Sequence, residues 1–78
     1  MFEMQLIVRG QWTSIKAADS TEPYRYPTLE EARYMMRICY PDQVREDRLG
    51  ATIKQTRIIN TKTGTPFVAW DRFETGET

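Results

Sequence analysis

The sequence contains no histidine and a single cysteine, Cys39. A chain without histidine cannot build a Ser-His-Asp triad, an imidazole base or a histidine metal site. One cysteine cannot close a disulfide within the chain or supply a cysteine zinc site, and a domain stabilised without disulfides is typical of a reducing compartment. We therefore expect a cytoplasmic protein without catalytic activity, bound metal or other cofactor.

Charge of one sign and glycine-rich loops are also lacking. The 11 Lys and Arg residues balance 11 Asp and Glu residues, so the formal net charge is zero. The basic excess typical of nucleic-acid-binding proteins is therefore missing. The glycines are isolated from one another, which excludes a glycine-rich phosphate-binding loop. Between Asp42 and Arg48, acidic and basic side chains are interleaved, so we expect local neutralisation rather than a Ca²⁺ loop.

Long hydrophobic runs are absent as well. A membrane-spanning helix needs about 20 consecutive apolar residues, and no run in this chain approaches that length. Residues 1–10 lack the basic start and the long apolar stretch of a signal peptide. We expect neither a signal peptide nor an association with membranes.

Two hairpins are predicted from alternating patterns and turn residues. Apolar and polar residues alternate over residues 2–8, and Gly10 marks a turn before a second strand over residues 12–17. Residues 51–60 are rich in Thr and Ile and predict a third strand. A loop from Asn60 to Gly64, with Gly64 in the left-handed conformation, leads into a fourth strand over residues 65–70.

One helix is predicted between the hairpins, over residues 29–40. Thr28 and Glu31 have the spacing of a capping box, and Pro41 cannot continue a helix. Residues 42–50 are expected to be a charged connection. The apolar stripe of this helix is expected to face the core, which would make Cys39 a buried and unreactive thiol. The stripe consists of Leu29, Ala32, Met36, Cys39 and Tyr40.

These elements predict an α+β domain of ββαββ order over residues 1–73, followed by a polar tail over residues 74–78. Its fold would be a four-stranded antiparallel sheet with one helix packed on one face. Because one helix covers only one face, the other sheet face would be open unless a partner covers it.

Candidate partner-binding residues fall into two groups. Tyr34 and Ile38 lie opposite the core stripe and are rimmed by Arg33 and Arg37, a composition typical of interfaces. Alternatively, this is an ordinary solvated helix face with one local apolar pair. Trp12 and Trp70 are the aromatic candidates for the open sheet face, although core packing would also account for such rings.

The resulting hypothesis is a small non-catalytic protein-interaction module of accessory or inhibitory type. Its size suggests a phage or a mobile element as its source. Its partners would be proteins, including a second copy of the chain as a homodimer. An alternative hypothesis is RNA or single-stranded DNA binding through an aromatic and Arg-containing sheet face. A third, a small enzyme, would require an unusual Tyr, Arg or carboxylate mechanism.

Overall fold

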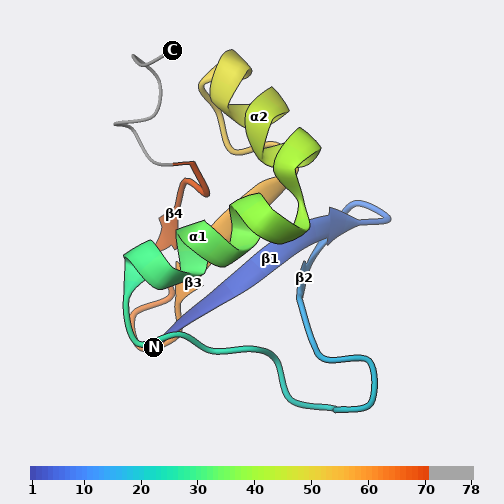
Figure 1. The fold of residues 1–78 in the computed structure, drawn as a ribbon, viewed down its shortest axis with the longest axis vertical. Coiled ribbons are helices and arrows are strands. Elements are labelled where there is room, and N and C mark those ends of the chain that lie inside the picture. The colour runs from blue at the N-terminus through green and yellow to red at the C-terminus, as the bar shows by residue number, and fades with distance from the viewer. Residues whose placement is uncertain (71–78) are drawn as a thin grey trace.

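The computed structural model describes residues 1–70 of the 78-residue chain. The chain forms an α+β fold with an antiparallel sheet, as predicted (Figure 1). Its elements are β1 (Phe2–Val8), β2 (Gln11–Ser14), α1 (Leu29–Cys39), α2 (Pro41–Gly50), β3 (Thr56–Asn60) and β4 (Pro66–Phe67). The predicted boundary at residue 73 and the predicted tail over residues 74–78 lie outside the described residues.

The sheet has the strand order β2-β1-β3-β4, with every neighbouring pair antiparallel. β1 is central, so Gln5 lies opposite Ser14 on one side and opposite Arg57 on the other. Single-residue bridges between Phe2 and Tyr26 and between Lys16 and Pro23 add strand pairing that the four-stranded prediction lacked. β1 has the predicted bounds, but the other three strands are shorter than predicted, since β2 ends at Ser14, β3 begins at Thr56 and β4 has only two residues.

Both predicted hairpin turns are confirmed. Arg9 and Gly10 have φ values of 52° and 80°, which is the conformation that a two-residue hairpin turn requires. In the second hairpin Gly64 has a φ of 78°, and its backbone N–H donates to the carbonyl oxygen of Asn60 at 2.7 Å. Left-handed backbone at both turns matches the right-handed twist of the strands that they join.

The N-cap of α1 at Thr28, one half of the predicted capping box, is also confirmed. Thr28 has extended backbone, and its hydroxyl oxygen accepts a hydrogen bond from the backbone N–H of Glu31 at 3.2 Å. The helix ends at Cys39, directly before the Tyr40–Pro41 peptide. This cap satisfies one of the backbone donors at the start of the helix that have no partner within it.

The segment predicted to be a charged connection forms a second helix, α2, so the ββαββ prediction is wrong in its helix count. Pro41 ends α1 but also occupies the first turn of α2, where its missing N–H has no cost and its fixed φ suits a helix. Asp42 lies in the same turn, and Ala51 ends the helix with a left-handed φ of 54°. In the sequence analysis, Pro41 was considered only as the residue that ends α1, and not as the start of a second helix.

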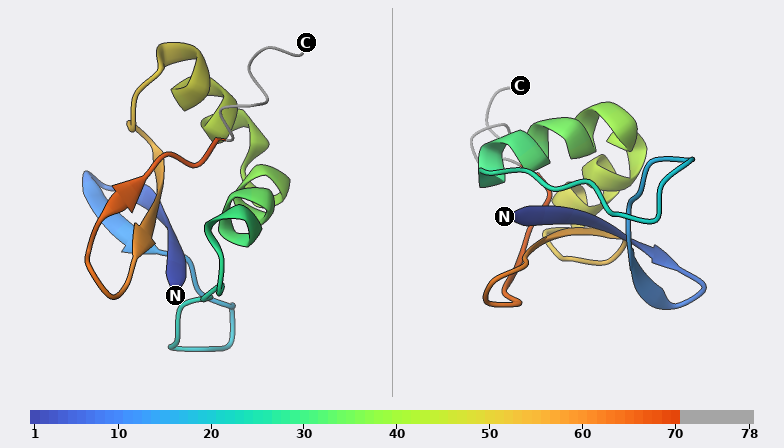
Figure 2. Two further views of the ribbon diagram at one scale, coloured as in Figure 1. Left: turned by 90° about the vertical axis from the view of Figure 1, so that its left-hand side faces the viewer. Right: turned by 90° about the horizontal axis from the view of Figure 1, so that it is seen from below.

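Both helices lie on the same side of the sheet, and the core is between the two layers (Figure 2). Neither helix contacts β2, so the helices cover β1 and β3 but not that edge. Trp70 is only 9% exposed and belongs to the core, so core packing and not the open sheet face is its position, as the second interpretation of this ring had it. The buried apolar residues are Met4, Ala32, Met36, Val44, Ile58, Ala69 and Trp70.

Cys39 is exposed, so the prediction that it is buried is wrong. Its helical phase differs little from that of the fully buried Met36. It lies in the last turn of α1, however, and α1 makes no contact with β2. A helical phase gives the direction of a side chain but does not show whether another element lies opposite it.

A buried carboxylate fixes the connection from α2 to β3. Asp47 is 1% exposed. Its Oδ2 atom accepts hydrogen bonds from the backbone N–H of Thr56 at 2.9 Å, from the Thr56 hydroxyl at 3.0 Å and from the backbone N–H of Gln55 at 2.9 Å. The backbone N–H of Lys54 donates to the same oxygen at 3.1 Å. These donors hold Asp47 in place, a role that the expected neutralisation by neighbouring arginines did not include.

Candidate functional site: the outer surface of the two helices

The exposed side of α1 carries two large apolar side chains. Tyr34 is 56% exposed and Ile38 is 55% exposed, and they lie one helical turn apart. The buried side of the same helix is formed by Ala32 and Met36. The structure therefore places Tyr34 and Ile38 on the solvent side, as predicted.

The two arginines predicted to flank this pair have different surroundings. The guanidinium carbon of Arg37 lies 5.8 Å from the centre of the Tyr34 ring, within the range of a cation–π interaction. The Arg33 Nε atom instead donates to the carbonyl oxygen of Val68 at 3.0 Å and ties α1 to the segment after β4. We call the surface formed by Tyr34, Arg37 and Ile38 the α1 face. Arg33 is not part of it, because its side chain is engaged with Val68.

A pocket of about 190 Å³ lies beside the α1 face, and Arg37 lines it too. The other lining residues come from α2 at positions i, i+3, i+4 and i+7, which share one side of a helix. We call this the arginine pocket, and it is lined by Arg37, Pro41, Val44, Arg45 and Arg48. This pocket was missed in the sequence analysis because residues 42–50 were expected to be a connection. The signal that could have found it is the helical spacing of these residues, which becomes apparent when Pro41 is assigned to the first turn of a helix.

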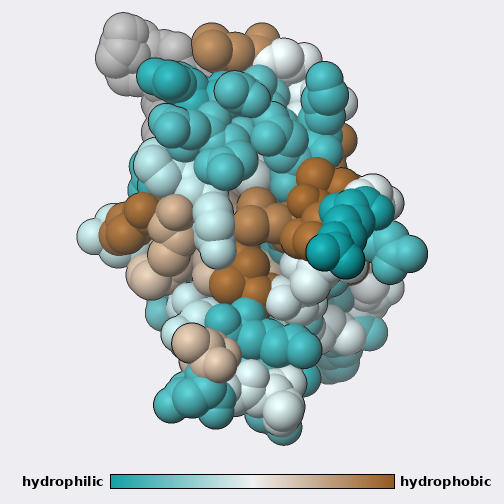
Figure 3. All heavy atoms as spheres, turned by 90° about the vertical axis from the view of Figure 1, so that its right-hand side faces the viewer, coloured by the Kyte–Doolittle hydropathy of each residue, from teal (hydrophilic) through white to brown (hydrophobic). Residues whose placement is uncertain are grey.

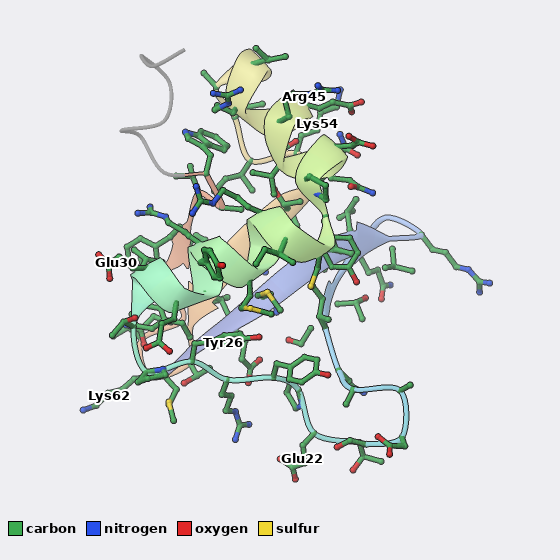
Figure 4. The ribbon with its side chains drawn as sticks, viewed as in Figure 1. Glu22, Tyr26, Glu30, Arg45, Lys54 and Lys62 are labelled. Carbon is green, nitrogen blue, oxygen red and sulfur yellow. The ribbon has the colours of Figure 1, made fainter. Side chains whose placement is uncertain are left out.

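Arg45 is the most exposed arginine of the pocket, with 63% of its side chain exposed, whereas Arg37 and Arg48 are half-buried. Its Nη2 atom lies 3.9 Å from an Asp42 carboxylate oxygen, a long and solvated pair that contributes little to stability. Figure 4 shows Arg45 on α2 and Lys62 at the opposite end of the molecule. Val44 is 4% exposed and provides a buried apolar contact in the pocket.

On the sheet face away from the helices, Trp12 is covered by an arginine. The guanidinium carbon of Arg57 lies 4.4 Å from the centre of the Trp12 ring. The Arg57 Nε atom donates to Gln5 Oε1 at 2.6 Å, and Gln5 Nε2 donates to the Ser14 hydroxyl at 3.1 Å. Burial lowers the pKa of Arg57, which fits a guanidinium packed against an aromatic ring.

The same network continues to the edge of the sheet through Glu3. The Ser14 hydroxyl donates to Glu3 Oε1 at 2.9 Å, and Arg25 Nε donates to Glu3 Oε2 at 2.9 Å. This hydrogen bond and the charge of Glu3 raise the pKa of Arg25. Glu3 is only 9% exposed. The uncovered face is thus closed by hydrogen-bonded polar side chains, and the structure does not bring Trp12 and Trp70 together on it.

The outer edge of β2 is available for pairing. The backbone N–H of Ile7 donates to the carbonyl oxygen of Gln55 at 3.0 Å, so the backbone groups of Ile7 point toward β3. Its cross-strand partner Trp12 therefore directs its own N–H and C=O away from β1. Within residues 1–70, β2 is an edge strand of the sheet.

Apolar side chains also reach the surface on the side where β2 is uncovered. Figure 3 shows hydrophobic side chains gathered in the middle of one face, below a hydrophilic region. Val8, at the end of β1, is 47% exposed.

In the part of the chain that the structure describes, no group of three or more Cys, Asp or Glu side chains is arranged to hold a metal ion.

Neither α1 nor α2 is long and apolar enough to cross a membrane, and no other helix occurs among residues 1–70. Comparisons with protein-family models, with curated proteins and with solved structures found no match to this chain.

Proposed function

We propose that this protein is a small non-catalytic interaction module that binds a partner protein through the α1 face. The observation that carries the proposal is the exposure of Tyr34 and Ile38 by more than half of their surface, with Arg37 beside the Tyr34 ring. Tyr and Arg are enriched among the residues that dominate binding energy at protein interfaces. A single cysteine supports the cytoplasm as the compartment in which this binding takes place.

The contacts that fix α1 to the rest of the fold support the same proposal. α1 is capped at Thr28, anchored through Ala32 and Met36, and tied to the segment after β4 by Arg33. A helix held in this way presents its exposed side chains with little freedom left to lose on binding. Rigid presentation of an aromatic anchor favours affinity because less ordering entropy opposes association.

Photocrosslinking tests this proposal. A benzophenone amino acid placed at Tyr34 should form a crosslinked protein adduct in cells of the source organism, because this side chain would lie within the interface. The same label at Lys62, in the turn between β3 and β4, should not form that adduct. The adduct at Tyr34 should disappear when Ile38→Ser is added. An equal adduct from both labelled positions would contradict the proposal.

A second copy of the chain is the partner that we propose for the β2 edge. The backbone of Trp12 faces outward there, and neither helix covers the strand. Antiparallel pairing about Thr13 would place Trp12 opposite Ser14 of the partner subunit and allow hydrogen bonds in both directions. The exposed Thr13 would then lie opposite the partner's Thr13.

Sedimentation equilibrium tests the homodimer. Thr13→Lys should shift the chain toward monomer, because like charges would meet at the centre of the paired edge. Thr52→Lys is the matched control, since Thr52 is also exposed and lies in the connection from α2 to β3. A native chain that stays monomeric at every concentration would contradict pairing at this edge.

The geometry gives less support to nucleic-acid binding. Arg57 occupies one face of the Trp12 ring, Trp70 is buried and Glu3 adds negative charge to the same sheet face. A stacking surface needs accessible rings next to cations. The uncovered sheet face is therefore the weaker candidate for a binding surface.

A further inference from the structure

We propose that the partner bound at the α1 face presents an acidic segment, whose carboxylates bind in the arginine pocket and whose apolar side chain packs against Pro41 and Val44. This inference rests on the proposed function and adds the chemistry of the partner to it. The juxtaposition that carries it is Arg37, which contacts the Tyr34 ring on one side and lines the pocket on the other. The α1 face and the pocket are therefore one continuous surface.

Charge complementarity selects an acidic partner. Three of the five pocket residues are arginines, and none is acidic. A planar guanidinium binds a carboxylate through two parallel hydrogen bonds, so a cluster of arginines is well suited to successive Asp or Glu side chains. The chain has no net charge, so this selectivity comes from the local arrangement of charge and not from the overall balance.

Each arginine of the pocket carries more N–H donors than a single partner uses. Arg37 and Arg48 are half-buried and also interact with other groups of the chain. A guanidinium has five N–H donors, so one side chain can serve two partners. Arg45 is more exposed, and its contact with Asp42 is long. Arg45 is therefore the side chain that a partner's carboxylate reaches at the smallest structural cost.

The size of the pocket indicates a peptide side chain. Its volume of about 190 Å³ is below the range of about 300–1,000 Å³ typical of sites for complete small-molecule ligands. Its apolar part is formed mainly by the exposed Pro41, with the nearly buried Val44 beneath it. One apolar side chain next to carboxylates would match a lining that combines apolar residues with cations.

Fluorescence anisotropy with the full chain tests the inference. The probe is a labelled Gly–Ser peptide in which glutamates flank one leucine, and the matched peptide carries glutamine in place of glutamate. The acidic peptide should bind and the glutamine peptide should not. Arg45→Ala should weaken binding about tenfold, since a hydrogen bond to a charged group is lost. Arg45→Lys should recover part of the loss because it keeps the charge.

Lys62→Ala is the control for general electrostatic attraction, since it removes the same charge far from the pocket (Figure 4). Equal losses for Arg45→Ala and Lys62→Ala would overturn the inference, as would equal binding of the two peptides. Preferential binding of a single-stranded oligonucleotide that Arg45→Ala abolishes would overturn it too. If the Tyr34 crosslink forms while the acidic peptide does not bind, the interaction function stands and the acidic chemistry is wrong.

Discussion

On the face of the sheet that the helices cover, Met4 and Ile58 lie opposite each other and are almost completely buried in one cluster with Met36. On the opposite face, Glu3 and Gln5 occupy the alternate positions of the same strand and join Ser14 and Arg57 in a chain of hydrogen bonds. One face is closed by apolar packing, and the other is closed by directional polar contacts.

The difference shows how a small chain manages two sheet faces with one layer of helices. Burial of apolar surface contributes about 25 cal/mol per Å² and needs a covering layer. A hydrogen bond contributes about 1 kcal/mol net and needs only a partner at the right distance. The polar network keeps the uncovered face from being a general apolar surface. The α1 face and the β2 edge are thereby left as the candidate binding surfaces.

The largest expected effect concerns the covered face. Ile58→Ala should lower the free energy of unfolding by about 4 kcal/mol, because a fully buried side chain leaves a cavity behind. Ile59→Ala is the matched control, since Ile59 is the next residue of β3 and lies on the other face. Its loss should be less than half as large. Equal losses in chemical denaturation would mean that the two faces do not differ as described.

A smaller but still large effect is expected for the buried carboxylate. Asp47→Ala should cost about 3 kcal/mol, because the buried N–H and hydroxyl of Thr56 lose their acceptor. Asp42→Ala, at an exposed position in the first turn of α2, should change the midpoint of thermal unfolding much less. If the two variants have similar midpoints, Asp47 is not the residue that fixes the connection from α2 to β3.

On the uncovered face the expected loss is smaller again. Glu3→Gln should cost about 1 kcal/mol, since charged contacts to Ser14 and Arg25 become neutral ones. A double-mutant cycle with Arg25→Ala measures the coupling between the two side chains. Additive losses in this cycle would show that the polar network does not act as a unit.

The smallest effect is a pH dependence at the edge where Tyr26 bridges Phe2. Burial is the main cause that raises the pKa of Tyr26, and the charges of Cys39 and Tyr24 contribute. The unfolded chain loses the phenol proton near pH 10, while the folded chain still holds it. Stability from this group is therefore complete below pH 10 and falls as the pH rises through the pKa of the folded state. The free energy of unfolding of Tyr26→Phe should therefore fall less above pH 10 than that of the native chain. An identical pH dependence of this free energy in both chains would contradict the role given to Tyr26.

Features that depend on neighbouring residues were predictable from the sequence. Gly10 and Gly64 take the left-handed backbone that their turns require, and Thr28 caps α1 through Glu31. The exposure of Tyr34 and Ile38 followed from the 3.6-residue period of a helix that was placed correctly. The arginine pocket did not follow, because α2 was not predicted.

The sequence by itself determined the α+β class, the two hairpin turns, the start of α1 and the solvent side of that helix. The turns, the helix start and its solvent side depend on interactions within a few residues, and the class follows from the order of the predicted elements. Only the tertiary structure decided that Cys39 is exposed, that Trp70 is buried and that Arg57 lies over Trp12. These outcomes depend on contacts between distant segments, such as Arg57 with Gln5 at a separation of 52 residues. Periodicity gives the direction of a side chain, but only the packed chain determines what lies opposite it.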